Sequence, residues 1–208
     1  IGSDILIDRW RPYDIGPRTI QTDAETYRIL GGLEWYWGNW DMESAFFYNY
    51  AEASDSSGNL IDKTLLNDAL ALTTPLAVNP FGGPGSNTDE QMDQIRTSIT
   101  NRADTELLSF DLRGSLSDLF TLSYTQYPVG IATGLEWRFE SYTDDRDKLI
   151  DGSIPYMLGL EKDINNNPTG SDLSNVAGIS PTADSRGQRN VLSTYGEILI
   201  PLISDIRF

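Results

Sequence analysis

Apolar and polar residues alternate with a period of two over residues 26–50, and this is the clearest pattern in the chain. Period two is typical of a strand with two unlike faces. Gly38-Asn39 supplies turn residues in the middle, after which the alternation resumes in the opposite phase. The apolar positions before the turn are Tyr27, Ile29, Leu33, Trp35 and Trp37. The pattern predicts a long hairpin with tryptophans, including Trp40 just after the turn, at its tip.

The same alternation predicts further strands. Residues 108–116 and 129–139 form a second hairpin around the connection 117–127. Residues 191–202 and 1–10 predict two weaker strands. The expected fold is therefore all-β, an antiparallel up-and-down meander of about six strands.

Long and short connections alternate between these strands. The long ones are 11–25, 52–106 and 143–188, and the short ones are 38–39, 117–127 and 201–205. In a meander, all the long connections then lie at one end of the sheet. Predicted strands of about 10–14 residues also exceed the soluble mode of about 5–6. These features favour the wall of a large outer-membrane β-barrel, although a soluble antiparallel sheet with one wet face would give the same alternation.

The charge distribution agrees with this interpretation. The chain has 31 acidic and 15 basic residues, a net charge of -16, and the three long connections carry -11 of it. The strand charges fall on the face opposite the apolar one, which would line a polar lumen. They are Arg28, Glu34, Asp111, Arg113, Glu136, Arg138 and Glu140. Such an acidic chain is a poor partner for nucleic acid, because phosphate binding needs clustered Lys and Arg.

Composition also excludes several kinds of chemistry. The chain has neither Cys nor His, so disulfides, thiolate metal sites and His-dependent catalytic triads are ruled out. Glu136 and Glu140 lie four residues apart on one strand, about 13 Å, which is beyond the spacing of hydrolytic carboxylate pairs. We therefore expect no enzymatic activity, no cofactor and no metal site. No apolar stretch approaches the roughly 18–20 residues that a membrane-spanning helix needs.

Several segments resemble TonB-dependent outer-membrane receptors, and they occur in the order of that family. PVGIATGLEWRFESY (128–142) resembles the wall strand that follows a periplasmic turn, and NPFGG (79–83) with NRADTELLSFDLRGSL (101–116) is similar to the loop and strand before it. TYGEILIPL (194–202) and TYRILGGLEWYWGNWDMESAFFYNY (26–50) resemble a later strand and an earlier hairpin. The resemblance implies a barrel of about 22 strands with a plugged lumen.

The resemblance also implies a function. Residues 1–208 would be part of a receptor barrel, without the plug, in the outer membrane of a Gram-negative bacterium. The parent protein would bind a scarce extracellular nutrient, such as a ferric siderophore, and import it with energy relayed by TonB. Expected partners are that small ligand, TonB and outer-membrane lipid, and the isolated piece should associate through its unpaired edge strands. The alternative is a soluble acidic β-domain that binds glycans on an aromatic platform of Trp35, Trp37 and Trp40.

The long loops contain three further features. Thr88 and Gln91 fit a capping box, which predicts one short helix over residues 88–100 inside an extracellular loop. Residues 163–167 are similar to the start of a calcium loop, but Pro168 stands where glycine is needed, so a polar turn is expected. Cations that could contact an anionic ligand are Arg96, Arg102, Arg146 and Lys148. They could equally pair with neighbouring carboxylates, and no substrate-binding residue is assigned.

Overall fold

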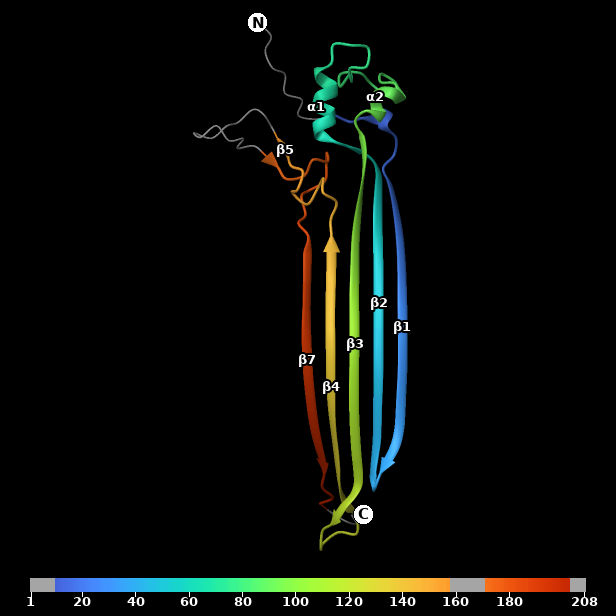
Figure 1. The fold of residues 1–208 in the computed structure, drawn as a ribbon, viewed down its shortest axis with the longest axis vertical. Helices are drawn as coiled ribbons and strands as arrows, with labels where there is room; N and C mark the ends of the chain where they lie inside the picture. Colours follow the sequence, from blue (N-terminus) through green and yellow to red (C-terminus); the bar gives the residue numbers. More distant parts are fainter. Residues whose placement is uncertain (1–9, 158–170, 203–208) are drawn as a thin grey trace, which may run out of the picture. The chain divides into compact units, whose positions relative to one another are not determined.

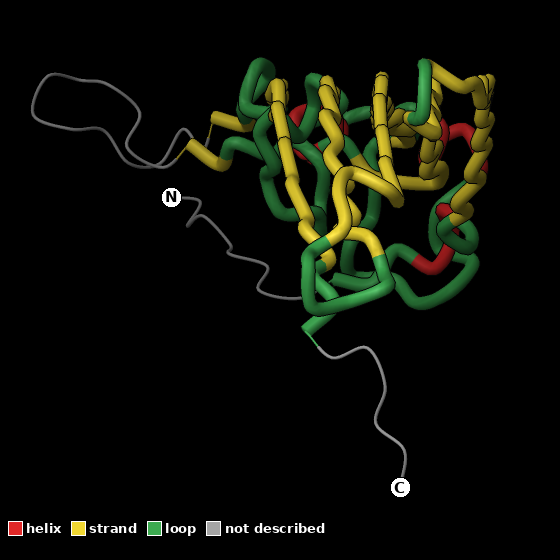
Figure 2. Tube along the Cα trace, turned by 90° about the horizontal axis from the view of Figure 1, so that it is seen from below, coloured by secondary structure: helices red, strands yellow, loops and turns green. Residues whose placement is uncertain are grey.

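A computed structural model describes residues 10–157 and 171–202 and shows an antiparallel sheet of five long strands (Figure 1). These strands are β1 (Thr19–Trp37), β2 (Trp40–Ile61), β3 (Arg96–Thr121), β4 (Pro128–Asp145) and β7 (Ser185–Leu199). Their order in the sheet is β1-β2-β3-β4-β7, which is the order in the chain. Viewed along the strands, they stand side by side in one row (Figure 2). The predicted all-β antiparallel meander is confirmed.

Shorter elements occur in the connections. β5 (Tyr156–Met157) and β6 (Ser171–Asp172) pair antiparallel in a small second sheet. The helical elements are η1 (Tyr13–Ile15), α1 (Lys63–Ala71) and α2 (Asp89–Asp93). The sequence predicted one loop helix, whereas the connection 62–95 between β2 and β3 contains two, α1 and α2. No helix in the described part of the chain is long and apolar enough to cross a membrane.

The long strands extend well beyond their predicted ends. β1 begins at Thr19 rather than at residue 26, β2 continues to Ile61, and β3 begins at Arg96. The predicted loop 52–106 therefore shrinks to residues 62–95, and the loop 143–188 shrinks to residues 146–184. In the added stretches both faces of the sheet are rich in polar residues, so no apolar alternation marks them as strands.

The predicted helix over residues 88–100 is wrong in its length. Its predicted start is correct. The Thr88 hydroxyl accepts a hydrogen bond from the backbone amide of Gln91, and the Gln91 side-chain oxygen accepts one from the backbone amide of Thr88. α2 nevertheless ends at Asp93, and residues from Arg96 onward belong to β3. Pairing within the sheet outweighs the helical spacing of Ile95 and Ile99.

Three predicted features lie outside the described residues. They are residues 1–9 of the predicted strand over 1–10, the polar turn at 163–167 with Pro168, and residues 203–205 of the predicted short connection 201–205.

The chain divides into two compact units, which we call the loop unit and the strand unit. The loop unit consists of Ile1–Asp23, Ala53–Arg102 and Asp144–Ser185. The strand unit consists of Ala24–Glu52, Ala103–Thr143 and Arg186–Phe208. The connections 62–95 and 146–184 both belong to the loop unit, whereas the turns 38–39 and 122–127 belong to the strand unit. The two long connections therefore belong to one unit and the two short turns to the other, as the meander predicted.

The buried hydrophobic residues of the described chain gather mainly in the loop unit. One cluster joins α1 and α2 to η1, and it contains Ile15, Ile61, Ala69, Val78, Met92 and Ile95. A second cluster contains Leu60, Ile99, Ile150 and Val176. Met92, Ile95 and Val176 have no exposed surface. The loop unit therefore has a hydrophobic core of the kind that stabilises proteins in water.

The strand unit is built differently. Among its described residues only Leu116 and Val129 are buried hydrophobics, and every residue of β1 is exposed. No described helix lies in this unit, so its part of the sheet is a single layer with two open faces.

Candidate functional site

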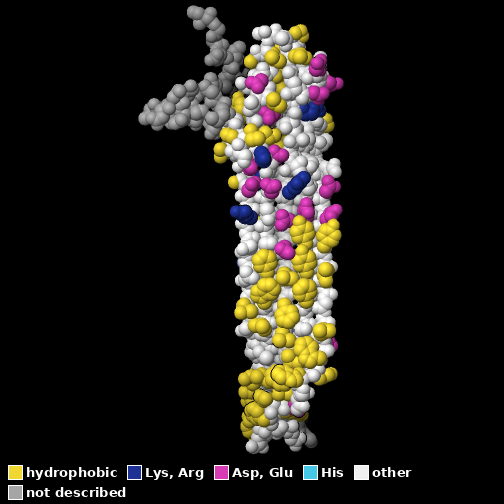
Figure 3. Space-filling model, in the orientation of Figure 1, with side chains coloured by type: hydrophobic (Ala, Val, Ile, Leu, Met, Phe, Trp, Pro, Cys, Tyr) yellow, Lys and Arg dark blue, Asp and Glu magenta, His cyan; other side chains and the backbone are white. Residues whose placement is uncertain are grey.

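One of the two faces of the strand unit carries a continuous band of hydrophobic side chains (Figure 3). We call this face the apolar face. Alternation places the odd-numbered residues of β1 and β4 and the even-numbered residues of β2, β3 and β7 on it. The band spans residues 27–37, 40–50, 108–120, 129–139 and 192–200. Its members on the two outer strands include Ile29, Leu33, Leu192 and Ile198, each at least 61% exposed. Such a contiguous apolar surface marks contact with a partner or with lipid.

Aromatic residues stand at both ends of this band. Trp37 and Trp40 flank the two-residue turn, and Trp37 is 73% exposed. At the other end, the Tyr27 hydroxyl donates a 2.7 Å hydrogen bond to Glu25, and the Tyr50 hydroxyl donates a 3.2 Å bond to Glu52. The band therefore passes directly into a row of carboxylates, with amphipathic rings at the boundary.

The opposite face, which we call the polar face, carries the charges that the sequence placed there. Arg113 pairs with Asp111 at 3.4 Å. Arg138 lies between Glu136, at 3.8 Å, and Glu140, at 2.8 Å. Glu140 also accepts a hydrogen bond from Arg189 on β7. Each pair joins residues of the same face, along a strand or across the neighbouring strands β4 and β7, so contacts between its members confirm the predicted charged face.

The charges of β4 and β7 form a connected series and β3 carries a separate ion pair, whereas the β1–β2 side of the polar face is different. There Arg28 lies over the Phe47 ring, 5.4 Å from its centroid. A hollow of about 640 Å³ opens on this face among Glu34, Asp41 and Glu43 from the hairpin and Arg113 from β3. The arrangement suits a hydrated surface, because its charges are exposed or paired with one another.

The three tryptophans of the predicted glycan platform share the apolar face. Trp37 and Trp40 line a hollow of about 350 Å³ together with Leu112 and Leu135. Trp35 is 39% exposed and lies on the same face of β1. The hairpin thus brings the three rings to one side of the sheet, as either interpretation of the sequence requires.

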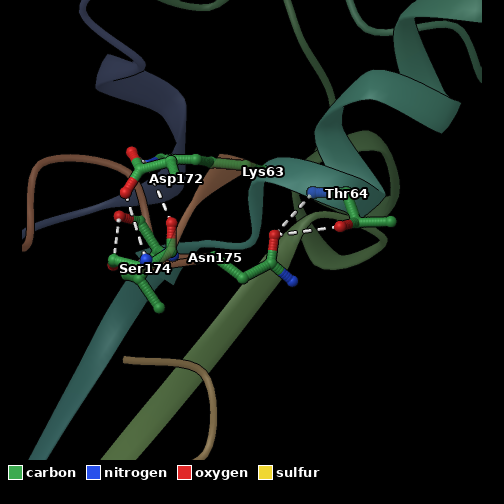
Figure 4. A network of polar contacts seen from close by, with 6 residues as sticks. Lys63, Thr64, Asp172, Ser174 and Asn175 are labelled. Carbon is green, nitrogen blue, oxygen red and sulfur yellow. Dashed lines mark hydrogen bonds and ion pairs between the residues drawn. The ribbon is translucent and has the colours of Figure 1, made fainter. Parts of the chain in front are cut away.

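A group of hydrogen-bonded residues in the loop unit joins the connections 62–95 and 146–184, and we call it the clasp. It consists of Asp62, Lys63, Thr64, Asp172 and Asn175. Figure 4 shows the last four of these residues together with Ser174. The Lys63 ammonium donates to Asp172 and, at 2.9 Å, to the Ser174 carbonyl. The side-chain oxygen of Asn175 accepts hydrogen bonds from the Thr64 amide, at 3.1 Å, and the Thr64 hydroxyl, at 2.9 Å. The start of α1 is therefore tied to a segment more than a hundred residues further along the chain.

Asn175 completes the clasp from its other side. Its side-chain nitrogen donates to both carboxylate oxygens of Asp62 at 3.1 Å, and Asp62 caps α1 by accepting the Leu65 amide at 2.9 Å. Asn175 and Asp62 are buried. The side-chain oxygen and nitrogen of Asn175 and both carboxylate oxygens of Asp62 have hydrogen-bond partners, as buried polar groups require. The Lys63 ammonium beside Asp172 holds the pKa of that carboxyl below its usual value. Sequence reasoning missed the clasp, although Asp62 before an apolar run was a visible N-cap signal.

A second carboxylate, that of Asp14, binds the glycine- and proline-rich turn of the connection 62–95. Asp14 accepts hydrogen bonds from the backbone amides of Gly85, at 2.6 Å, and Asn87, at 3.0 Å. These amides lower the pKa of the Asp14 carboxyl. The turn is thereby held against η1, and Phe81 within it remains 74% exposed.

The cations considered as ligand contacts divide into two pairs. Arg96 donates to the Ile15 carbonyl at 3.0 Å and to Asn59, and it pairs with Asp93 at 3.0 Å. Arg146 pairs with Asp144. Both arginines therefore hold the loop unit together. Within residues 10–157 and 171–202, Arg102 and Lys148 form no ion pair.

The carboxylates of the second long connection are also engaged by the protein. Asp147 accepts the Thr100 amide and the Leu149 amide, both at 3.0 Å. Among the described residues no group of three or more acidic side chains is arranged to hold a metal ion. Comparison of the chain with protein-family models, with curated proteins and with solved structures gave no match.

Proposed function

We propose that the strand unit is a segment of the membrane-spanning wall of an outer-membrane receptor barrel, with the apolar face against lipid and the polar face toward the lumen. The observation that supports it best is the apolar band on one face of a single-layered sheet. A sheet whose hydrophobic side chains are exposed on both outer strands gains little from burial in water. Lipid would supply the missing apolar contact.

The dimensions of the band suit a bilayer. Eleven residues in each of 27–37, 40–50 and 129–139 extend over about 33 Å of strand. With the strand tilt of about 40° that is usual in such barrels, the band would be about 25 Å tall, which is the height of the apolar zone of outer-membrane barrels. Its aromatic ends, at Trp37 and Trp40 on one side and Tyr27 and Tyr50 on the other, would lie at the two interfaces.

The receptor part of the proposal rests on the loop unit and on the family resemblance. Long connections that pack around their own core and are clasped together present a defined surface, which recognition of a ligand requires. The segments that resemble TonB-dependent receptors coincide with β1–β2, β3, β4 and β7 in order. The proposed parent protein therefore binds a scarce extracellular nutrient, such as a ferric siderophore, and imports it with energy relayed by TonB.

Two leucines on β1 provide a matched test of lipid contact. Leu33 is 72% exposed on the apolar face, and Leu30 is 69% exposed on the polar face. Leu33→Lys would place a charge near the middle of the lipid zone at a cost of about 2–4 kcal/mol, whereas Leu30→Lys would face the lumen. In flotation with phosphatidylcholine vesicles, Leu33→Lys should leave the lipid fraction much more readily than Leu30→Lys. Equal behaviour of the two variants, or failure of the parent chain to float, would contradict the proposal.

A second candidate function, glycan binding, is favoured by the exposed Trp37 ring and its neighbour Trp40. Stacking on such rings is a common mode of sugar recognition by proteins in water. Titration of the chain with soluble oligosaccharides, followed by tryptophan fluorescence, tests it. A shift that Trp37→Ala abolishes, in a chain that stays soluble without detergent, would support the glycan module over the barrel wall.

A further inference from the structure

A second hollow opens on the polar face of the strand unit, and we call it the Tyr142 hollow. It has a volume of about 540 Å³, which is within the range of small-molecule sites. Strands β3, β4 and β7 form it, and all its lining residues belong to the strand unit. The lining residues whose side chains share the polar face are Thr105, Leu107, Glu140, Tyr142, Gly187 and Arg189.

An aromatic ring and a leucine give this hollow an apolar floor. Gly187 has no side chain, and the Tyr142 ring of the neighbouring strand lies over it, since a Cβ at Gly187 would be only 2.7 Å from a ring carbon. The ring is therefore held against the sheet, and Tyr142 still exposes 49% of its surface. Leu107 lines the same hollow from β3. Such a floor suits a flat apolar group, which stacks on an aromatic ring.

The cation of the hollow is Arg189, whose side chain is 67% exposed. Its Nε donates to one carboxylate oxygen of Glu140, and the Nε of Arg138 pairs with the other oxygen at 2.8 Å. Two arginines therefore share one carboxylate. Within the described part of the chain, no acidic residue pairs with the two terminal nitrogens of Arg189. The fork of a guanidinium binds a carboxylate through parallel hydrogen bonds, so these nitrogens suit an anion of that kind.

We propose that the Tyr142 hollow binds a small aromatic carboxylate, with its ring on Tyr142 and Leu107 and its carboxylate on the terminal nitrogens of Arg189. The proposal names a ligand class for the receptor and rests on the proposed function, which turns the polar face toward the lumen.

The charges around the hollow favour an anion over a cation. Glu140 is already shared by two arginines, and Glu136 lies 3.8 Å from Arg138. Glu106 also borders the hollow, but alternation places its side chain on the apolar face. A ligand with a positive charge would therefore meet an exposed arginine and no free carboxylate on the polar face of the hollow.

Closure of the proposed barrel leaves the hollow unchanged. Its lining comes from three strands that are neighbours in the sheet, β3, β4 and β7. Further strands would pair with the edges of the sheet, whereas the hollow lies on one of its faces. A ligand would reach it through the polar lumen.

Equilibrium dialysis of 2-naphthoate against the chain in neutral detergent micelles tests the proposal, with the uptake by protein-free micelles subtracted. The unmodified chain should bind 2-naphthoate, and it should bind 2-naphthylmethylammonium, a cation with the same ring system, at least about tenfold more weakly. Arg189→Gln should weaken 2-naphthoate binding about tenfold or more, because a hydrogen-bonded charge pair is lost. Equal binding of the two probes, or no binding of 2-naphthoate, would overturn the proposal.

Matched variants show whether the effect belongs to the hollow. Arg186→Gln removes a cation from the same strand, but alternation places Arg186 on the apolar face, so 2-naphthoate binding should not change. Tyr142→Ala should weaken binding about fivefold through loss of stacking, whereas Tyr36→Ala, on the polar face of β1, should not. Far-UV circular dichroism checks that each variant keeps its strands. Equal losses in a variant and its control would contradict the assignment.

The same dialysis on the full-length receptor shows whether the hollow is open in the whole protein. The receptor should bind 2-naphthoate, and Arg189→Gln should weaken binding there as well. Binding by the chain and not by the receptor would mean that another part of the receptor covers the hollow, and it would overturn the proposal. Flotation tests the apolar face and dialysis tests the hollow, so failure of the proposed function and failure of this ligand class are distinguishable.

Discussion

The strand unit and the loop unit are stabilised in opposite ways although all five long strands have residues in both. In the loop unit, Met92, Ile95 and Val176 are fully buried, and polar groups such as Asn175 are buried with partners. In the strand unit, Leu33, Trp37 and Ile198 expose more than half of their surface. The loop unit already satisfies the rules of a protein in water, whereas the strand unit would satisfy them with an apolar solvent at one face.

The difference shows how a continuous strand can serve two environments. Along β2 the backbone ladder is the same, but the residues on the apolar face change from Phe46 and Tyr48 to Glu52, Ser54 and Ser56. The side chains therefore decide where the proposed lipid contact ends. This change occurs close to the boundary between the two units, at Glu52.

The largest effect is expected from a truncation in the loop-unit core. Ile95→Ala would leave a cavity beside Met92 and Ile61, at a cost of about 2–5 kcal/mol. The matched variant Ile198→Ala, in the exposed band, should cost no more than about 0.5 kcal/mol in detergent-free buffer. Hydrogen exchange of the loop-unit amides measures both. Similar effects of the two variants would mean that the units do not differ in the way described.

Two glycines of the strand unit, Gly134 and Gly196, differ in the space around them. A Cβ at Gly134 would collide with the Tyr195 ring on the neighbouring strand, whereas a Cβ at Gly196 would meet no atom within 4 Å. Gly134→Ala should therefore destabilise the sheet by about 1–3 kcal/mol through overpacking. Gly196→Ala is the control, and it should be close to neutral. Urea unfolding in detergent, followed by tryptophan fluorescence, distinguishes them.

The clasp should respond to loss of its central amide. Asn175→Ala leaves Asp62 without two donors and Thr64 without its acceptor, which should cost about 1–3 kcal/mol. Asn190→Ala, on an exposed part of β7, serves as the control. The expected readout is faster proteolysis between residues 62 and 95 in Asn175→Ala. Unchanged proteolysis would show that the clasp does not hold the two long connections.

The smallest effect is a pH dependence of the same clasp. Because Lys63 lowers the folded-state pKa of Asp172 below 3.8, the pair stabilises the loop unit above that pH. The stabilisation is lost as the pH falls from about 3.8 through the lowered value. Since the Asp172 side chain is 39% exposed, we expect less than about 1 kcal/mol. Asp172→Asn should flatten this part of the stability curve relative to the parent chain, and an identical curve would contradict the assignment.

The alternation of residues was sufficient to predict the meander, its two faces and the hairpin at Gly38-Asn39. Each of these depends on neighbours two residues apart or on a local turn, which a sequence displays directly. The capping box at Thr88 and Gln91 is local in the same sense, and it was also found. The placement of Arg113, Glu136 and Arg138 on one face followed from parity alone.

Tertiary contacts set what the pattern could not show. β1 and β2 continue past the apolar band because each pairs with its neighbour, although polar residues on both faces hide the alternation. α2 ends at Asp93 because the residues from Arg96 onward pair within the sheet as β3. The clasp joins Asp62 to Asn175 across 113 positions, and only the folded chain brings these two side chains together. Such long-range hydrogen bonds have no period and no fixed spacing, so the physical information that specifies them resides in the packing of the two long connections and not in any local stretch.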